Sequence, residues 1–213
     1  MDGDLAEKLF RAGAVRLEGK YFLKAHENRP DDPLSPIYFD LRNLASDLNE
    51  YIGKYLRDLA RWENLKYQYI VGLPKAGVSL AKAFASAPVG DSERILTSKN
   101  IIFLEKEETE TGRRILPTVI GDYSQHKKVL VIDDVVSSGT TIIEALNALS
   151  LNGLFVEDCL VVIDREQGGK EELTKYGVRL HSIATVTGLL NFYVANKSIS
   201  PEKQQEVIDY LKT

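Results

Sequence analysis

The sequence contains a single cysteine, Cys159, which cannot form a disulfide within the chain and is expected to pack as a small apolar residue. No apolar run approaches the roughly 20 residues of a membrane span, and the N-terminus has no basic segment followed by an apolar one. The 27 basic residues form no long block and are outnumbered by 31 acidic ones. Nucleic acid and membrane are therefore not expected partners, and a cytoplasmic protein that binds a small molecule is predicted.

The chain alternates between two hydrophobic patterns over 213 residues, which is enough for one globular domain with a substantial core. Continuous apolar runs, typical of strands buried on both faces, occur at 66–73, 100–105, 128–134, 158–165 and 178–186. Helical spacing occurs at 41–62, 77–87, 139–153 and 170–177. This alternation predicts an open α/β fold, with a mainly parallel sheet flanked by helices.

The two ends of the chain follow other patterns. Residues 14–24 alternate like a hairpin around a Glu-Gly turn, residues 35–40 form a short extended segment, and the polar, proline-rich stretch between them reads as a loop. We expect residues 1–40 to form a small hood on a core of residues 41–213, within one domain. From residue 187 two closing helices are predicted, the second capped by Ser200 with Pro201 in its first turn.

The stretch VLVIDDVVSSGTTIIEAL, residues 129–146, contains the strongest chemical signal. Asp133 and Asp134 follow an apolar strand, and ligands of open parallel sheets bind at that edge. Two carboxylates can accept hydrogen bonds from a sugar diol or hold a hydrated magnesium ion, while residues 137–141 and the following helix start can bind an anion. Alternatively, the acids only cap the helix and the turn is ordinary. The spacing matches neither a Walker loop nor a dinucleotide fingerprint.

An apolar strand, two acids, two residues and a hydroxyl-glycine-hydroxyl run resemble the phosphoribosyl pyrophosphate signature of the type I phosphoribosyltransferases. The resemblance implies the type I phosphoribosyltransferase fold. It also implies that the two acids bind the ribose hydroxyls and, through water, Mg²⁺, while the turn binds the 5-phosphate. The donor-binding residues it implies in this motif are Asp133, Asp134, Val135, Val136, Ser137, Ser138, Gly139, Thr140 and Thr141.

Three further stretches resemble the orotate phosphoribosyltransferases within that family. Residues 163–190 match the segment whose arginine binds the pyrimidine, a role that falls on Arg165. Residues 70–81 look like the pyrophosphate loop, with Lys75 and Ala76 at its tip. Residues 13–24 and 35–42 of the hood resemble the hood of the same enzymes. The base-binding residues that the resemblance implies are Lys24, Tyr38, Phe39, Ser137 and Arg165.

The stretch EKEETETG, residues 105–112, departs from the family pattern. Relatives have a mobile loop with several cations there, which stabilise the departing pyrophosphate, whereas this chain has Glu107 and Glu110 at the lysine positions. Lys106 stands at the arginine position, and two arginines follow the glycine. The expected catalytic residues are Lys106, Arg113, Arg114 and, from the donor motif, Asp134. An acidic loop should not close over an anionic site, because it would repel the leaving group.

The resemblance implies an enzyme that transfers phosphoribose from phosphoribosyl pyrophosphate to orotate in pyrimidine nucleotide synthesis, with Mg²⁺, as a homodimer that shares the mobile loop. Two alternatives stay open. The acidic loop favours a non-catalytic relative that senses phosphoribosyl pyrophosphate or a nucleotide. An insertion within residues 25–34 favours transfer to a different base.

Overall fold

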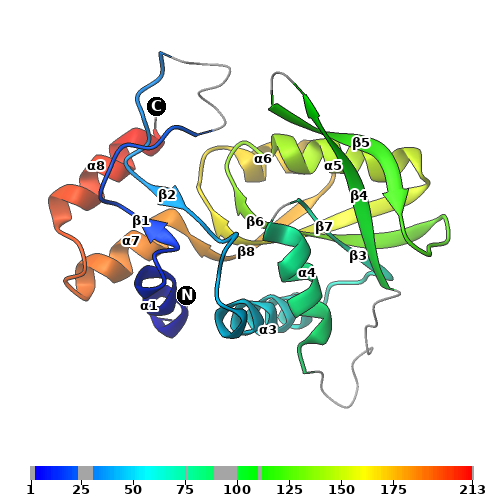
Figure 1. The fold of residues 1–213 in the computed structure, drawn as a ribbon, viewed down its shortest axis with the longest axis horizontal. Helices are drawn as coiled ribbons and strands as arrows, with labels where there is room; N and C mark the ends of the chain where they lie inside the picture. Colours follow the sequence, from blue (N-terminus) through cyan, green and yellow to red (C-terminus); the bar gives the residue numbers. More distant parts are fainter. Residues whose placement is uncertain (1–2, 24–30, 75, 89–99, 110–111, 213) are drawn as a thin grey trace.

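The computed structural model describes residues 3–23, 31–74, 76–88, 100–109 and 112–212. Its main sheet has six strands in the order β5-β4-β3-β6-β7-β8 (Figure 1). Their bounds are β3 Tyr69–Gly72, β4 Ile101–Thr109, β5 Gly112–Ile120, β6 Lys127–Val136, β7 Leu154–Asp164 and β8 Arg179–Thr185. All neighbours pair in parallel except β5, which is antiparallel to β4. The predicted α/β fold with a mainly parallel sheet is confirmed.

Helices cover both faces of this sheet. Helices α3 (Ser46–Trp62) and α4 (Ala76–Ser86) lie on one face, and α5 (Thr140–Leu151) and α6 (Gly169–Lys175) lie on the other (Figure 1). Successive strand residues point to opposite faces, so Ile132 belongs to the apolar cluster under α3 and α4, while Val131 belongs to the cluster under α5. Burial on both faces explains the continuous apolar runs in the sequence.

The predicted helix ends agree with the backbone. Gly153 and Gly177, which follow α5 and α6, have φ values of +71° and +73°, which a glycine adopts at no steric cost. Helix α7 spans Val186–Ala195 and α8 spans Pro201–Leu211. Ser200 caps α8, because its hydroxyl accepts a hydrogen bond from the Lys203 N–H at 3.2 Å, and Pro201 occupies the first turn. No helix among the described residues is long and apolar enough to cross a membrane.

The expected hairpin around Glu18 and Gly19 is wrong. Strand β1 (Val15–Arg16) pairs with the distant β2 (Tyr38–Phe39), and Tyr21 pairs with Ser35 in an isolated antiparallel bridge. Pairing between these two arms buries Val15 and Phe39 in the same apolar cluster, which a local hairpin would not do. The partner of this alternating segment therefore lies beyond the loop.

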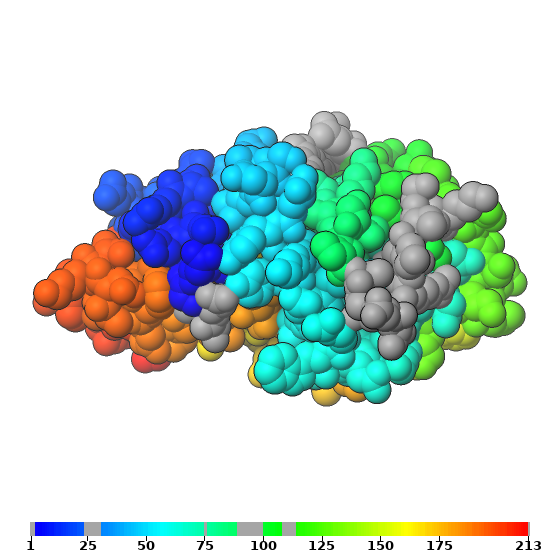
Figure 2. Space-filling model, turned by 90° about the horizontal axis from the view of Figure 1, so that it is seen from below, coloured from blue at the N-terminus to red at the C-terminus, as the bar shows by residue number. Residues whose placement is uncertain are grey.

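An N-terminal helix, α1 (Gly3–Arg11), was not predicted. It packs on α7, and the Tyr193 hydroxyl donates to the Ala6 carbonyl at 3.0 Å. Lys20 also forms an ion pair with Glu206 of α8 at 2.6 Å. Figure 2 shows the blue N-terminal segment lying against the orange C-terminal helices. The hood is thereby held by the closing helices at one end of the sheet.

Candidate functional site

The two acids of the donor motif, Asp133 and Asp134, lie near the C-terminal end of β6, at the carboxyl edge of the sheet. Asp133 is 8% exposed and Asp134 is half-buried. The Asp134 N–H donates to Asp133 Oδ1 at 2.9 Å, and the Val135 N–H donates to Asp134 Oδ1, also at 2.9 Å. Each carboxylate is therefore oriented by the backbone N–H of the next residue in its own strand.

Burial raises the pKa of the Asp133 carboxyl well above its ordinary value, and the negative charge of Asp134 adds to the rise. The backbone bond from Asp134 and the charge of Lys106 lower that pKa in part. A divalent cation beside the pair would favour both ionised forms. No group of three or more His, Cys, Asp or Glu side chains in the described ranges could hold a metal, so a cation here would need water and substrate oxygens as its other ligands, as Mg²⁺ commonly does.

The turn after β6 exposes its polar groups. Ser137, Ser138 and Thr140 are exposed, and the hydroxyls of Ser138 and Thr140 lie 3.0 Å apart. Gly139 precedes α5 in a left-handed conformation with φ of +80°, and no side chain caps the helix start. The first N–H groups of α5 are thus left for an anion, which the helix dipole favours. Thr141 follows in the first turn of α5 and is half-buried.

Glycines hold the neighbouring loop, between β3 and α4, close to the donor strand. A Cβ on Gly72 would lie 2.1 Å from the Gly77 carbonyl oxygen, and a Cβ on Gly77 would lie 2.6 Å from the Ile132 oxygen. The Leu73 N–H donates to the same Ile132 oxygen at 2.9 Å. Ala76 is buried at the start of α4. Lys75, the other predicted loop residue, lies outside the described residues, as does Lys24.

The stretch expected as an acidic loop is mostly strand. Residues 105–109 belong to β4, and β5 begins at Gly112, so the two strands form a hairpin that the sequence interpretation missed. The register places Glu107 opposite Arg114 and Glu108 opposite Arg113. The acids of β4 therefore have basic residues across the hairpin, and they do not form an isolated acidic loop.

Lys106 differs from its neighbours in the side it faces. Its ammonium group donates to the carbonyl oxygen of Pro74, in the β3–α4 loop, at 3.4 Å. The residues before and after it, Glu105 and Glu107, are exposed. The register shifts between Leu104 and Lys106, which turns the lysine toward that loop. Of the other cations, Arg114 is exposed, and the side chain of Arg113 is outside the described part of the structure.

Arg165 lies directly after β7, beside the donor strand. Its backbone N–H donates to the Val136 carbonyl at 2.9 Å. The side chain is only 5% exposed: Nη2 donates to Ser35 Oγ at 3.3 Å, and Cζ lies 5.8 Å from the centroid of the Phe39 ring. The hood thus meets the core at this guanidinium.

The guanidinium of Arg165 forms no ion pair with an acidic residue in the part of the chain that the structure describes, and its Nε makes no hydrogen bond there. Burial lowers the pKa of Arg165, and the charge of the Tyr210 side chain of α8 raises it in part, yet a guanidinium stays charged in a protein. A buried charge without a counterion is costly. An anion that paired with Arg165 would remove that cost, so this position favours a negatively charged ligand group.

The two predicted hood aromatics lie apart. Phe39 is buried in the core and contacts the Arg165 guanidinium through its ring face. Tyr38 is half-buried and stacks on Tyr21 at 5.4 Å, with Arg16 at 5.8 Å from its ring centroid. The structure therefore brings Phe39, but not Tyr38, to Arg165.

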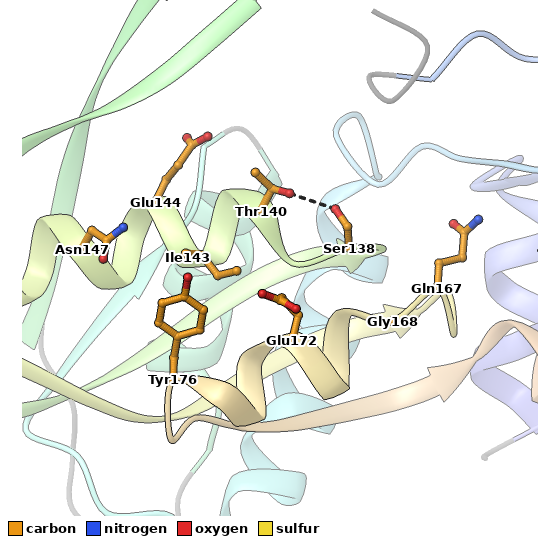
Figure 3. Close-up of a pocket in the computed structure, with 9 residues that line it drawn as sticks. All are labelled: Ser138, Thr140, Ile143, Glu144, Asn147, Gln167, Gly168, Glu172 and Tyr176. Carbon is orange, nitrogen blue, oxygen red and sulfur yellow. Dashed lines mark hydrogen bonds between the residues drawn. The ribbon is translucent and has the colours of Figure 1, made fainter. Parts of the chain in front are cut away.

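A hollow of about 540 Å³ lies between α5 and α6, next to the turn (Figure 3). Ser138 and Thr140 stand at its turn end, and Asn147 and Tyr176 at the other. Its complete lining is Ser138, Thr140, Ile143, Glu144, Asn147, Gln167, Gly168, Glu172 and Tyr176. The carboxylates on the helices disfavour a phosphate away from the turn, so an anion is expected at the turn end only.

Several residues that shape the site were missed in the sequence. Ser35 was assigned no role, and the close approach of Gly72 and Gly77 was not recognised. Gly169 belongs to the same group, because a Cβ there would lie 2.4 Å from the Ser137 carbonyl oxygen. Glycines at a strand end and at helix starts were a possible signal for such contacts, whereas nothing local marked Ser35 as a partner of Arg165.

Comparisons with a family model, with curated proteins and with solved structures all point to phosphoribosyltransferases. The family model described as "Phosphoribosyl transferase domain" matches residues 37–188. The orotate phosphoribosyltransferase of Staphylothermus marinus is 30% identical over 206 residues, covering 96% of this chain and 89% of that protein. The uridine 5'-monophosphate synthase of Bos taurus is 29% identical, but the chain spans only 40% of its length. The crystal structure of orotate phosphoribosyltransferase from Aeropyrum pernix superposes with a TM-score of 0.68 at 28% identity, covering 88% of this chain and 96% of that one.

Proposed function

Since this chain belongs to the phosphoribosyl transferase domain family, in its orotate phosphoribosyltransferase branch, we propose that it transfers the phosphoribosyl group of phosphoribosyl pyrophosphate to orotate. The products are the pyrimidine nucleotide and pyrophosphate, and the reaction belongs to pyrimidine nucleotide synthesis. Close relatives in both sequence and structure bear the name of this enzyme and match nearly their whole length.

The buried guanidinium of Arg165 is the observation that carries the choice of base. It lies at the carboxyl edge of the sheet, next to Val136 of the donor strand, and it has no carboxylate partner among the described residues. Arginine suits a carboxylate, because its planar N–H groups match the two oxygens. Orotate is a pyrimidine with a carboxylate, so it supplies the missing anion, whereas uracil has none.

The donor would lie along the edge between the turn and the β3–α4 loop. Residues 137–141 and the start of α5 would bind the 5-phosphate, and the carboxylates of Asp133 and Asp134 would bind the ribose hydroxyls. The two acids, together with water and the pyrophosphate oxygens, fit a Mg²⁺ ion, which would neutralise part of the pyrophosphate charge. Asp133 would then ionise more readily, because a cation offsets the carboxylate repulsion described above.

The transfer breaks the bond between ribose C1 and a pyrophosphate oxygen, and a ring nitrogen of the base forms the new bond to C1 and releases its proton to water or to the departing pyrophosphate. The bonding electrons leave with the pyrophosphate, so negative charge grows on that group as the bond breaks. Lys106, whose ammonium group donates to Pro74 in the β3–α4 loop, would stabilise this charge, and Lys75 is the second candidate. Asp134 would hold the ribose while C1 moves from one bond to the other.

We further propose that the protein works as a homodimer in the cytoplasm. The dimer rests on the resemblance to enzymes that share their mobile loop between subunits, and Arg113 and Arg114 near the end of the β4–β5 hairpin are the residues that would reach a neighbouring site. The cytoplasmic location rests on the single, buried Cys159, which needs no oxidising compartment.

The test compares orotate with uracil, which differs only by the carboxylate. The purified protein is incubated with phosphoribosyl pyrophosphate, Mg²⁺ and either base, and pyrophosphate release is followed. We expect kcat/KM for orotate to exceed that for uracil by on the order of 10² to 10⁴, because a buried Arg165 left unpaired is costly. Equal rates with both bases would contradict orotate as the substrate. Donor binding without turnover on orotate, uracil or a purine would instead support the non-catalytic sensor.

A further inference from the structure

A buried hydroxyl in the hood touches the proposed base-binding arginine. Ser35 is 0% exposed, and its Oγ accepts a hydrogen bond from Arg165 Nη2 at 3.3 Å, across 130 residues of sequence. The face of the Phe39 ring is the other hood contact of this guanidinium. Both contacts come from one arm of the hood, residues 35–39, so this arm holds one side of the guanidinium.

The direction of the Ser35 hydroxyl follows from its other partner. A serine hydroxyl has one proton, and that of Ser35 goes to the Ile37 carbonyl oxygen at 2.7 Å. The oxygen accepts from the Ile37 N–H at 3.3 Å and from Arg165 Nη2 at 3.3 Å, so the hydroxyl serves the guanidinium as an acceptor. The backbone of Ser35 is fixed as well, because it exchanges two hydrogen bonds with Tyr21, at 2.8 and 3.0 Å. The acceptor is therefore held in one place.

The chain around Arg165 is equally constrained at its backbone. Its N–H is bonded to Val136, and the next residue, Glu166, has φ of +58° and accepts the Thr187 N–H through Oε2 at 2.7 Å. These bonds fix where the side chain begins but leave its torsions free. The contact with Ser35 fixes the far end. With Nη2 so engaged, Nε stays without a partner among the described residues.

We propose that Ser35 is a positioning residue for the base, which orients the Arg165 guanidinium so that the N–H groups not bonded to Ser35 meet the carboxylate of the ligand. The inference rests on the proposed function, because it assumes that Arg165 binds an anionic base. A guanidinium that is already oriented loses less torsional freedom when the base binds, so the hydroxyl increases affinity without touching the ligand. The hood thereby takes part in base recognition through Ser35.

The first experiment replaces the hydroxyl and separates the kinetic constants. For Ser35→Ala we expect kcat/KM for orotate to fall about tenfold, mainly through KM, because a hydrogen bond to a charged group is lost. KM for phosphoribosyl pyrophosphate should change by less than about twofold, since the donor does not contact this hydroxyl. Ser35→Cys, which fills the same space with a weak acceptor, should show the same loss. Tyr193→Phe is the matched control, because it removes another buried hydroxyl, bonded to Ala6, far from Arg165.

A double-mutant cycle distinguishes positioning from a general structural role. If Ser35 acts through Arg165, then Ser35→Ala in an Arg165→Gln background should change kcat/KM for orotate by less than about twofold. Equal, additive losses in both backgrounds, or equal losses for donor and base, would overturn the proposal. An active wild type with an unchanged Ser35→Ala variant would refute only the positioning role. A wild type that neither binds nor converts orotate would instead refute the proposed function and this inference with it.

Discussion

At the scale of single residues, the donor motif combines a binding role with a cost to stability. Asp133 is buried beside the second carboxylate of Asp134, and both effects raise its pKa above the ordinary value of 3.8. The folded state then holds a proton on Asp133 more tightly than the unfolded chain does. Its contribution to stability is greatest below the ordinary pKa and is lost as the pH rises through the raised pKa. In the absence of ligand, the ionised pair therefore destabilises the protein at neutral pH.

The variant Asp133→Asn should expose this cost. It keeps the shape of the side chain and removes the charge, so we expect the free energy of unfolding at pH 7 to rise by about 1 kcal/mol, or about 2–4 °C in Tm. The gain should disappear toward pH 4, where the native carboxyl is protonated. Binding of phosphoribosyl pyrophosphate with Mg²⁺ should be lost. Thermal unfolding across this pH range and calorimetric titration with the donor are the measurements.

The exposed residue Asp122 supplies the control for this comparison. Asp122→Asn also removes one negative charge, but from a solvated position, so its stability should stay within about 0.5 kcal/mol of wild type. A drop in Tm for Asp133→Asn at pH 7 would contradict the stated cost. It would show that the carboxylate stabilises the free protein through an interaction stronger than the repulsion from Asp134.

At the scale of elements, the β4–β5 hairpin determines which charges face the site. Strand alternation and the register shift before Lys106 turn this lysine toward Pro74, while Glu105 and Glu107 stay exposed. The number of acids in a stretch is therefore a poor guide to the field at the site. The relevant charge is that of the side chain on the inner face.

The pair Lys106→Ala and Glu107→Ala tests this reading of the hairpin. Removal of Lys106 should lower kcat by on the order of 10² to 10³, because one group that stabilises the developing pyrophosphate charge is lost. Removal of Glu107, one residue away on the outer face, should change kcat by less than about threefold, as is usual for exposed positions. Steady-state kinetics with saturating donor and orotate would decide. A large rate increase for Glu107→Ala would restore the view that the acids repel the leaving group.

The same hairpin shows where the sequence was informative and where it was not. Strand β6 and helix α5 were predictable, because a continuous apolar run, a turn motif and helical spacing follow one another locally. Strand β5 was missed, since Pro117 in its middle argues against a strand, yet an edge strand tolerates proline. The pairing of β1 with β2 and the contact of Ser35 with Arg165 join distant segments, so no local pattern encodes them. The approach of Gly72 to Gly77 is likewise a contact in space.

At the scale of the whole molecule, the site residues divide into those that one chain can supply and those that a dimer would share. Lys106 contacts Pro74 of its own chain, so it should serve the site of its own subunit. The side chain of Arg114 is exposed and makes no hydrogen bond or ion pair with the described residues, although its backbone pairs with Glu107 in the hairpin. In the proposed homodimer, Arg113 and Arg114 are therefore the residues expected to reach the neighbouring site.

Mixing inactive variants distinguishes a residue that serves the site of its own subunit from one that reaches the site of the neighbouring subunit. Arg165→Gln mixed with Lys106→Ala should recover no activity, because in a mixed dimer each site then lacks one of its own residues. Arg165→Gln mixed with the double variant Arg113→Ala, Arg114→Ala should recover about one quarter of the wild-type rate, because about half of the dimers are mixed and one of their two sites is complete. The measurement is pyrophosphate release after subunit exchange, with each variant alone as the baseline. Recovery with Lys106→Ala would assign that lysine to the partner's site, and no recovery with the arginine variant would refute a hairpin shared between subunits.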